Sequence, residues 1–329
     1  MNKTKVSFFL NNKKVHANEN ESIWQVSKRM GEEIPHLCYL DEKSYRADGN
    51  CRACMVEIEG ERVLAASCIR KPQEGMKVFT SSDKAKKSRE LVFELLLADQ
   101  PKKEKAHDSE SHFWKWIEEV EVKESRFPEK KPCEPDVSHP SMAVNLDACI
   151  QCNLCVRACR EVQVNDVIGM AYRGENSKIV FDFDDPMGDS TCVACGECVQ
   201  ACPTGALMPS SIVDEKGVGN TKVDKKVQSV CPYCGVGCQL EYNVNDNKIA
   251  YVNGKDGPAN ENRLCVKGRF GFDYVNNPER LTRPLIRIKD KEKDLHPSIN
   301  FSNIHEYFRE VSWEEALDYA ASGIIKLRQ

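Results

Sequence analysis

The hydrophobic and polar positions of this chain of 329 residues form several short patterns rather than one long one. Residues 4–16 contain two strand-like runs joined by the polar sequence Asn11-Asn12-Lys13-Lys14, which predicts a β-hairpin. A short helix is predicted over residues 22–30, with Ser22 as its N-cap and apolar positions on one face. Strands are predicted at residues 55–59 and 63–66, and a charged amphipathic helix over residues 82–98.

This order of strand, strand, helix, strand and strand matches a β-grasp ferredoxin. Residues 99–140 are rich in Lys, Glu and Pro and are interrupted by the aromatic residues Phe113, Trp114 and Trp116. The composition predicts a helical connector with a docking face and no core of its own.

Residues 149–202 contain an internal repeat, because CIQCNLCVRAC and CVACGECVQAC share their cysteine spacing. A flexible linker is predicted over residues 213–226, and strand-like runs follow at residues 240–244 and 248–252. Ser312-Trp-Glu-Glu315 is a capping box that opens a helix. The apolar stripe of that helix has no core to cover it within the chain, so we expect a further domain to begin here.

Composition and charge narrow the class of protein. Hydrophobic residues make up 40% and charged residues 30%, which fits several small domains better than one large core. A net charge of −4 with mixed signs gives no reason to expect nucleic-acid binding. The sequence has no signal-peptide core and no apolar stretch of membrane-spanning length. We therefore expect a cytoplasmic protein whose seventeen cysteines hold metal instead of forming disulfides.

Sixteen of the cysteines fall into four sets of four thiolates, the usual ligand number of an iron–sulfur cluster. The first set, Cys38, Cys51, Cys54 and Cys68, has the [2Fe–2S] pattern of plant-type ferredoxins with a wider first gap. A zinc site is the alternative, since zinc also accepts four thiolates.

The next two sets are two C-x2-C-x2-C-x3-C runs, which are too compact for one tetrahedral zinc. In two-cluster ferredoxins the fourth cysteine of each run binds the other cluster. One [4Fe–4S] cluster is therefore expected at Cys149, Cys152, Cys155 and Cys202, and a second at Cys192, Cys195, Cys198 and Cys159. Pro203 follows the second run, whereas Arg160 replaces proline after the first.

The fourth set joins Cys231, Cys234 and Cys238 to Cys265, with Gly235 and Gly237 allowing the chain to turn closely. Spacing alone also permits a zinc ribbon. CPYCGVGC, followed by LCVKGRFGFDYVNNPERLTRPLIR, resembles the N-terminal cluster domain of molybdenum or tungsten bis-pterin oxidoreductases, formate dehydrogenases above all.

Nearly the whole chain resembles the N-terminal third of the alpha subunit of cytoplasmic, NAD-linked formate dehydrogenases. That subunit is related to the large iron–sulfur subunit of respiratory complex I and to NAD-reducing hydrogenase subunits. The resemblance implies an α+β, multidomain fold with the following parts: a β-grasp [2Fe–2S] domain (1–82), a helical connector (83–140), a bacterial-type two-cluster [4Fe–4S] ferredoxin domain (141–212), a linker (213–226), a small [4Fe–4S] domain of molybdopterin oxidoreductase type (227–285) and the start of a truncated pterin-binding domain (286–329).

The resemblance also implies functional roles. Lys267 matches the lysine that lies between the last cluster and a pterin, so it is expected to contact that cofactor and help electrons pass. The molybdenum or tungsten bis-pterin guanine dinucleotide, and the catalytic residues, are expected only in a full-length protein. We therefore expect this chain alone to carry no catalytic residue and to relay electrons to a partner subunit that handles flavin and NADH.

The chain departs from relatives of complex I type at one site. Those relatives carry an extra cluster held by one histidine and three cysteines, whereas residues 98–116 hold His107 and His112 but no cysteine. That site is expected to be absent, and Cys133 is expected to be an unligated thiol. A relay subunit of complex I or NAD-reducing hydrogenase type, a standalone multi-cluster carrier and a zinc-stabilised scaffold are the alternative functions.

Overall fold

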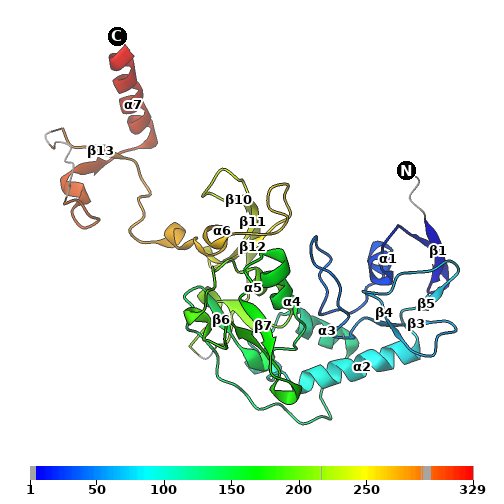
Figure 1. The fold of residues 1–329 in the computed structure, drawn as a ribbon. Coiled ribbons are helices and arrows are strands. Elements are labelled where there is room, and N and C mark those ends of the chain that lie inside the picture. The colour runs from blue at the N-terminus through cyan, green and yellow to red at the C-terminus, as the bar shows by residue number, and fades with distance from the viewer. Residues whose placement is uncertain (1–4, 216, 290, 292–297, 329) are drawn as a thin grey trace. The chain divides into compact units, whose positions relative to one another are not determined.

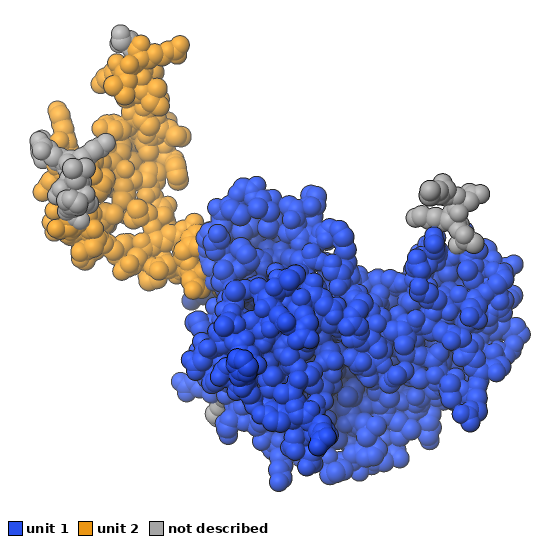
Figure 2. Space-filling model, viewed as in Figure 1, with its two compact units in different colours: residues 1–271 blue, residues 272–329 orange. Residues whose placement is uncertain are grey.

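The structure, a computed structural model, describes residues 5–215, 217–289, 291 and 298–328. The chain divides into two compact units, Met1–Gly271 and Phe272–Gln329, which are coloured separately in Figure 2. Thr4, the first residue of the predicted hairpin, lies outside the described residues. All of the cysteines belong to the first unit.

The N-terminal part of the first unit is a five-stranded mixed sheet of order β2-β1-β5-β3-β4 (Figure 1). Its elements are β1 (Val6–Leu10), β2 (Lys13–Ala17), α1 (Ile23–Arg29), β3 (Met55–Ile58), β4 (Ala65–Ala66) and β5 (Lys77–Phe79). Strand β1 pairs antiparallel with β2 and parallel with β5. Residues of the sheet and of α1 form one buried core that includes Phe8, Trp24, Val56 and Val78.

Local sequence explains most of these elements. Asn11 and Asn12 have φ values of 47° and 67°, so the hairpin closes in a two-residue turn. Lys13 and Lys14 belong to β2, whereas the sequence pattern had placed them in the loop. Ser22 caps α1 in a capping box with Gln25, as expected. Strand β5 was not predicted, because three residues are too few to show a period.

The connector is built from α2 (Asp83–Ala98) and α3 (His112–Val120). The buried Arg89 of α2 donates to the carbonyls of Met55 (2.8 Å) and Thr80 (2.6 Å), which fastens this helix to the sheet. Phe113 and Trp114 of α3 are buried in a core that also contains Leu37 and Ala53 of the N-terminal part. The aromatic group therefore does pack against the neighbouring domain.

The repeat region combines short strands with short helices. These are β6 (Met142–Val144), α4 (Leu154–Arg157), β7 (Ile168–Ala171), β8 (Lys178–Phe181), α5 (Glu197–Ala201) and β9 (Leu207–Pro209). Strands β6 and β9 pair antiparallel, and so do β7 and β8. A π-helical segment, Ala158–Val162, continues directly from α4. Helices α4 and α5, one from each half of the repeat, are in contact.

The segment predicted as a flexible linker makes specific contacts. The Gly217 carbonyl accepts hydrogen bonds from His107 (2.9 Å) and from Asn145 (3.0 Å). The Gly219 amide donates to the His107 carbonyl at 2.8 Å. Strand β10 (Lys225–Val230) begins inside the predicted linker and joins β11 (Gln239–Asn245) and β12 (Lys248–Gly254) in an antiparallel sheet. Helix α6 (Val266–Phe270) ends the first unit.

The second unit contains β13 (Leu285–Arg287), β14 (Phe308–Glu310) and α7 (Trp313–Arg328). The Glu315 amide donates to the Ser312 hydroxyl at 3.1 Å, as the capping box predicted. The apolar stripe of α7 is exposed, with Leu317 at 64% and Ile324 at 67%. Across the described ranges of the chain, no helix is both long and apolar enough to cross a membrane.

Candidate iron–sulfur centres

The first cysteine set is brought together by the segment between α1 and β3, which carries Cys38, Cys51 and Cys54, and by the segment after β4, which carries Cys68. Cys38, Cys54 and Cys68 are buried, and Cys51 is partly buried. The Cys38 thiol is hydrogen-bonded to Cys51 and to Cys68, and these contacts lower the pKa of Cys38 to about 2. The Cys54 thiol is also hydrogen-bonded to Cys68, and this contact lowers the pKa of Cys54 to about 7. Four sulfur atoms linked by such contacts in buried loops suit a small iron–sulfur cluster.

The second set surrounds a small cavity. All four cysteines expected to share a cluster line it, namely Cys149, Cys152, Cys155 and Cys202. The apolar side chains of Ile150, Ile179 and Leu207 complete its wall. Cys202, which comes from the other run, therefore lies on the wall of the same cavity as the first three cysteines of this run. Soft thiolate donors in an apolar shell are the donor set that iron–sulfur clusters use.

In the third set, Cys159 of the first run lies near cysteines of the second run. The charges of Cys192, Cys195 and Cys159 all act on the thiol of Cys198, which is buried. Burial is the main cause that raises the pKa of Cys198, and the three neighbouring sulfur atoms raise it further. Iron binds thiolates, so these thiols must lose their protons when a cluster binds. The bonds to iron then offset the free-energy cost of burying the negative charge.

Backbone amides point at the sulfur atoms of three sets. Hydrogen bonds of 3.3–3.4 Å run from Cys51 to Cys38, from Gln151 to Cys149, from Ala194 to Cys192 and from Val167 to Cys159. Such donors stabilise a negatively charged sulfur and raise the reduction potential of a bound cluster. Gln151 and Ala194 each have a φ of 54°, the left-handed backbone that turns these amides inward.

The fourth set is closer to solvent. Cys231 is buried and Cys238 is partly buried, whereas Cys234 and Cys265 are exposed. The three other thiols act electrostatically on Cys238, so the four lie near one another. Gly268 leaves room for Cys231, because a Cβ at that glycine would lie 3.3 Å from the sulfur. Within the described ranges, no group of three or more histidine, cysteine or acidic side chains has the arrangement of a single-ion metal site.

The other residues that the sequence analysis named lie at separate places in the chain. Lys267 is exposed on α6, two residues after Cys265. Cys133 is exposed, and burial of part of its surface raises its pKa. His107 is buried and contacts Asp147 at 2.6 Å through Nε2, whereas His112 is exposed at the start of α3.

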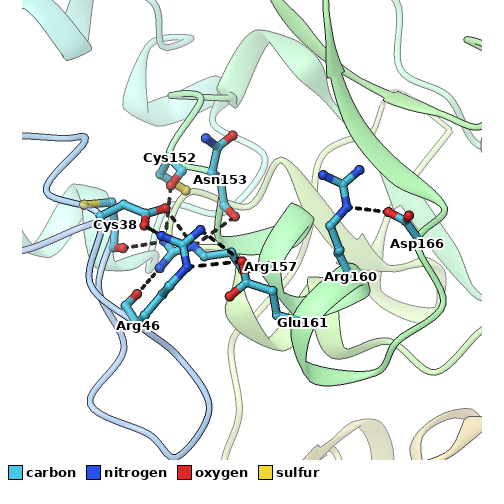
Figure 3. A network of polar contacts seen from close by, with 9 residues as sticks. Cys38, Arg46, Cys152, Asn153, Arg157, Arg160, Glu161 and Asp166 are labelled. Carbon is cyan, nitrogen blue, oxygen red and sulfur yellow. Dashed lines mark hydrogen bonds and ion pairs between the residues drawn. The ribbon is translucent and has the colours of Figure 1, made fainter.

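A buried arginine lies between the first and second cysteine sets (Figure 3). Arg157 is 2% exposed, and its Nη2 donates to the Cys38 carbonyl at 2.7 Å and to the Cys152 carbonyl at 3.5 Å. Its Nε lies 3.2 Å from Asp48, and its Nη1 donates to the carbonyl of Arg46. This guanidinium therefore bonds peptide groups of cysteines from two different sets.

A second buried arginine lies between the third and fourth sets. Arg269 of α6 is 2% exposed and donates from Nε to the Cys195 carbonyl at 2.8 Å. Its other nitrogens contact Gln200 at 2.8 Å and Glu197 at 3.4 Å. Tyr45 donates to the other oxygen of Glu197 at 3.0 Å, and burial together with the charge of Glu197 raises the pKa of this phenol.

Residues 39–50, here called the ligand loop, connect Cys38 to Cys51 and make many of the contacts between domains. Sequence reasoning noted only that this gap is wide. The additional residues of the loop bind neighbouring domains. Five of them form hydrogen bonds or ion pairs with residues of other domains: Lys43 with Glu261, Ser44 with Arg263, Tyr45 with Glu197, Arg46 with Glu161 and Asp48 with Arg157.

The functional residues that sequence reasoning missed are Tyr45, Arg157, Glu197 and Arg269. Arg157 carried a signal, because a charged residue occurs there in a run of otherwise apolar positions between Cys155 and Cys159. Glu197 carried a weaker one, since it replaces the leucine found at the same position of the first repeat. Their partners are distant in sequence and had no local signal.

Three family models match the chain. Residues 3–83 match a 2Fe-2S iron-sulfur cluster binding domain, and residues 148–206 match a 4Fe-4S dicluster domain. Residues 224–277 match the molybdopterin oxidoreductase Fe4S4 domain. The matched segments contain all four cysteine sets in the expected order.

Curated relatives match almost the whole chain. A subunit of an NADH-quinone oxidoreductase from Rhizobium meliloti is 31% identical over 93% of this chain and 35% of its own length. A Staphylococcus haemolyticus protein named "Putative formate dehydrogenase SH0748" is 28% identical over 90% of this chain and 32% of its own length. The chain spans about a third of the length of the curated relatives it matches.

A solved structure is also similar. The crystal structure of an NAD+-reducing [NiFe]-hydrogenase in the H2-reduced state contains a chain with 25% sequence identity and a TM-score of 0.58. The match covers 66% of this chain and 90% of that one. Homologues of the chain therefore include proteins named as formate dehydrogenases, an NADH-quinone oxidoreductase and an NAD+-reducing hydrogenase, and its four cysteine sets lie in segments that match 2Fe-2S, 4Fe-4S and molybdopterin oxidoreductase Fe4S4 domains.

Proposed function

We propose that the chain is the electron-transfer segment of a formate dehydrogenase alpha subunit. It would relay electrons between a molybdenum or tungsten bis-pterin site for formate or carbon dioxide and an NAD-linked flavin partner. The observation that carries this proposal is that four cysteine sets lie in one compact unit, with the molybdopterin-type set last. A flavin partner and free thiolates suit a reducing compartment, so we also propose a cytoplasmic location.

We propose the following ligand sets. A [2Fe–2S] cluster would be held by Cys38, Cys51, Cys54 and Cys68. Three [4Fe–4S] clusters would be held by Cys149, Cys152, Cys155 and Cys202, by Cys192, Cys195, Cys198 and Cys159, and by Cys231, Cys234, Cys238 and Cys265. Each bound cluster supplies a site that accepts and releases one electron. The protein contributes the spacing of these sites and the hydrogen bonds to their sulfur atoms. Lys267, exposed beside the last set, would face the pterin.

Anaerobic purification followed by iron, sulfide and zinc analysis tests the proposal. We expect about fourteen iron atoms per chain, two from the [2Fe–2S] site and twelve from the three [4Fe–4S] sites. Zinc as the main metal would contradict it and would favour a structural scaffold. The 329-residue chain alone should not reduce dyes with formate, and formate oxidation by this chain would contradict the expectation that the catalytic site lies elsewhere.

A relay subunit of complex I or NAD-reducing hydrogenase type is the second candidate. The similarity to the hydrogenase chain, with a TM-score of 0.58, is the observation that favours it. Metal analysis of the protein purified from its native cells separates the two functions. Molybdenum or tungsten supports the formate dehydrogenase, whereas nickel in a co-purifying subunit supports the hydrogenase type.

A further inference from the structure

The two halves of the internal repeat receive a guanidinium at the same backbone position. Cys152 and Cys195 are the second cysteines of their runs, and both carbonyls accept a hydrogen bond from a buried arginine. Arg157 supplies it in the first half, from its own helix. Arg269 supplies it in the second half, from α6 of the neighbouring domain. The same contact is thus made twice from unrelated places in the chain.

Arg157 connects the carbonyl of one proposed ligand to that of another. Its Nη2 lies 2.7 Å from the Cys38 carbonyl, which belongs to the first set, and 3.5 Å from the Cys152 carbonyl of the second set. Asp48 contacts the same side chain and belongs to the ligand loop. Figure 3 shows Arg157 beside Cys38 and Cys152, with the exposed pair of Arg160 and Asp166 off to one side.

Arg269 makes the corresponding connection at the other end of the repeat. Its helix begins directly after Cys265, and its guanidinium reaches the Cys195 carbonyl of the third set. Gln200, which accepts from Arg269 at 2.8 Å, occupies the repeat position that Arg157 occupies in the first half. The second half therefore lacks an arginine of its own and takes one from the domain of the fourth set.

Arginine has the chemistry for such a role. Its planar fork has five donors in fixed directions, so one side chain can hold several carbonyls in register. It remains positively charged, and a buried charge acts strongly on nearby groups because little water screens it. Each arginine can therefore fix the separation of two ligand loops and also favour the reduced, more negative state on either side.

We propose that Arg157 and Arg269 are positioning residues of the relay, which hold the ligand loops of successive cluster sites against each other. Arg157 joins the Cys38 loop to the Cys152 loop, and Arg269 joins the Cys265 helix to the Cys195 loop. The inference rests on the proposed relay function. The step that they assist is the passage of one electron, with no bond formed and no proton moved.

The test uses the 329-residue chain loaded with iron and sulfide under anaerobic conditions. Arg157→Met and Arg157→Lys are compared with Arg160→Met, a control that removes an exposed arginine from the same segment. Reduction potentials are measured by titration followed by electron paramagnetic resonance, and electron redistribution is measured after a laser pulse of a photoreductant. Arg269→Met and Arg269→Lys are measured in the same way.

We expect Arg157→Met to lower the potential of both adjacent sites, because a positive charge is lost. A tenfold change in the reduction equilibrium corresponds to about 59 mV for one electron. We expect Arg157→Lys to retain the potentials but to slow redistribution at least tenfold, because lysine keeps the charge without the planar fork. If Arg157 served only in folding, Arg157→Lys would not retain the potentials while slowing the redistribution of electrons. Arg160→Met should behave as the wild-type chain in both.

Unchanged potentials and unchanged redistribution in a fully loaded Arg157→Met chain would overturn the inference. If that variant loses iron, Arg157→Lys decides, and a wild-type rate in it overturns the inference. Failure of the wild-type chain to load or redistribute electrons would instead overturn the relay function. Hydrogen exchange of residues 39–50 would then decide the positioning role, which predicts faster exchange in Arg157→Met and is wrong if exchange is unchanged.

Discussion

The two halves of the repeat have the same backbone turns between their first cysteines and different neighbours. Gln151 and Ala194 share a φ of 54°, and Asn153 and Gly196 have φ values of 64° and 69°. The amides of Gln151 and Ala194 each donate to the first cysteine of their run at 3.4 Å. The halves differ at positions between the cysteines, where Leu154 and Arg157 in the first half correspond to Glu197 and Gln200 in the second.

This difference shows that the cysteines and the turns determine the geometry of each site, whereas the residues between the cysteines determine which part of the protein packs against it. The first half buries Leu154 and directs its own Arg157 to the ligand loop. The second half buries Glu197, which is 2% exposed and becomes the counter-ion of the incoming Arg269. An ion pair that is this deeply buried stabilises poorly on its own but becomes costly when one partner is removed.

The largest effect is expected from Glu197→Leu, which gives the second half the residue found in the first. Arg269 would keep its charge in a buried site without a carboxylate, and we expect a loss of about 3–5 kcal/mol in the free energy of unfolding. Urea unfolding followed by circular dichroism measures it. Glu161→Gln, which changes an exposed pair with Arg46, is the control and should cost less than about 1 kcal/mol. Equal midpoints for Glu197→Leu and the wild type would contradict the asymmetry of the two halves.

Tyr45→Phe is expected to have the next largest effect. The ligand loop meets the first half through Asp48 and the second through Tyr45, whose hydroxyl donates to Glu197 at 3.0 Å. Removing a buried hydrogen bond to a charged group costs about 1.5–3 kcal/mol. The same urea experiment measures the loss. In the background of Glu197→Leu the substitution should cost almost nothing, and a full cost there would show that Tyr45 acts through another partner.

Gly196→Asn converts the second half to the residue of the first at a left-handed position. A Cβ at Gly196 would lie 2.1 Å from Cδ of Arg269, so the arginine must move. We expect a loss of about 1–3 kcal/mol from this overpacking, together with faster hydrogen exchange in α6. Asn153→Gly is the matched control, because φ is 64° there and the buried Asn153 Oδ1 has no hydrogen-bond partner among the described residues. An asparagine tolerated equally well in both halves would contradict the prediction.

The smallest effect concerns Glu42 in the ligand loop. Burial raises the pKa of this carboxyl above its ordinary value of 4.5, and the charge of Glu197 raises it further. The folded state therefore holds the proton more tightly than the unfolded chain, and stability is lost as the pH rises through the raised pKa. Glu42→Gln should equal the wild type below pH 4.5 and exceed it in stability at neutral pH. The same difference at both ends of a pH series would contradict this explanation.

Sequence reasoning found the parts whose information is local. The turn at Asn11, the cap at Ser22 and the cap at Ser312 follow from residues within a few positions of one another, and the structure has all three. Strand β5 and the fixed contacts of the predicted linker were missed, because both depend on partners far along the chain.

The candidate sites divide in the same way. The spacing of the cysteines predicted the four ligand sets, and Cys202 lines the same cavity as three cysteines of the first run. Tyr45 and Glu197 are separated by 152 positions, and no periodicity or spacing rule connects them. The wide gap between Cys38 and Cys51 was apparent in the sequence. The contacts made by the residues in that gap could be identified only from the positions of the other domains.

A cluster bound at both Cys38 and Cys51 would couple its own binding to the docking of the ligand loop. Cys38 and Cys51 stand at its two ends, so a cluster held by both would tie the ends together and reduce the freedom that the loop loses on docking. Thermodynamic reciprocity then requires that docking tighten the hold on the cluster by the same factor. An N-terminal domain separated from the repeat should therefore shed its iron sooner than the same domain in the whole chain. The contacts that join the domains would thus also determine whether cluster insertion or domain docking is completed first.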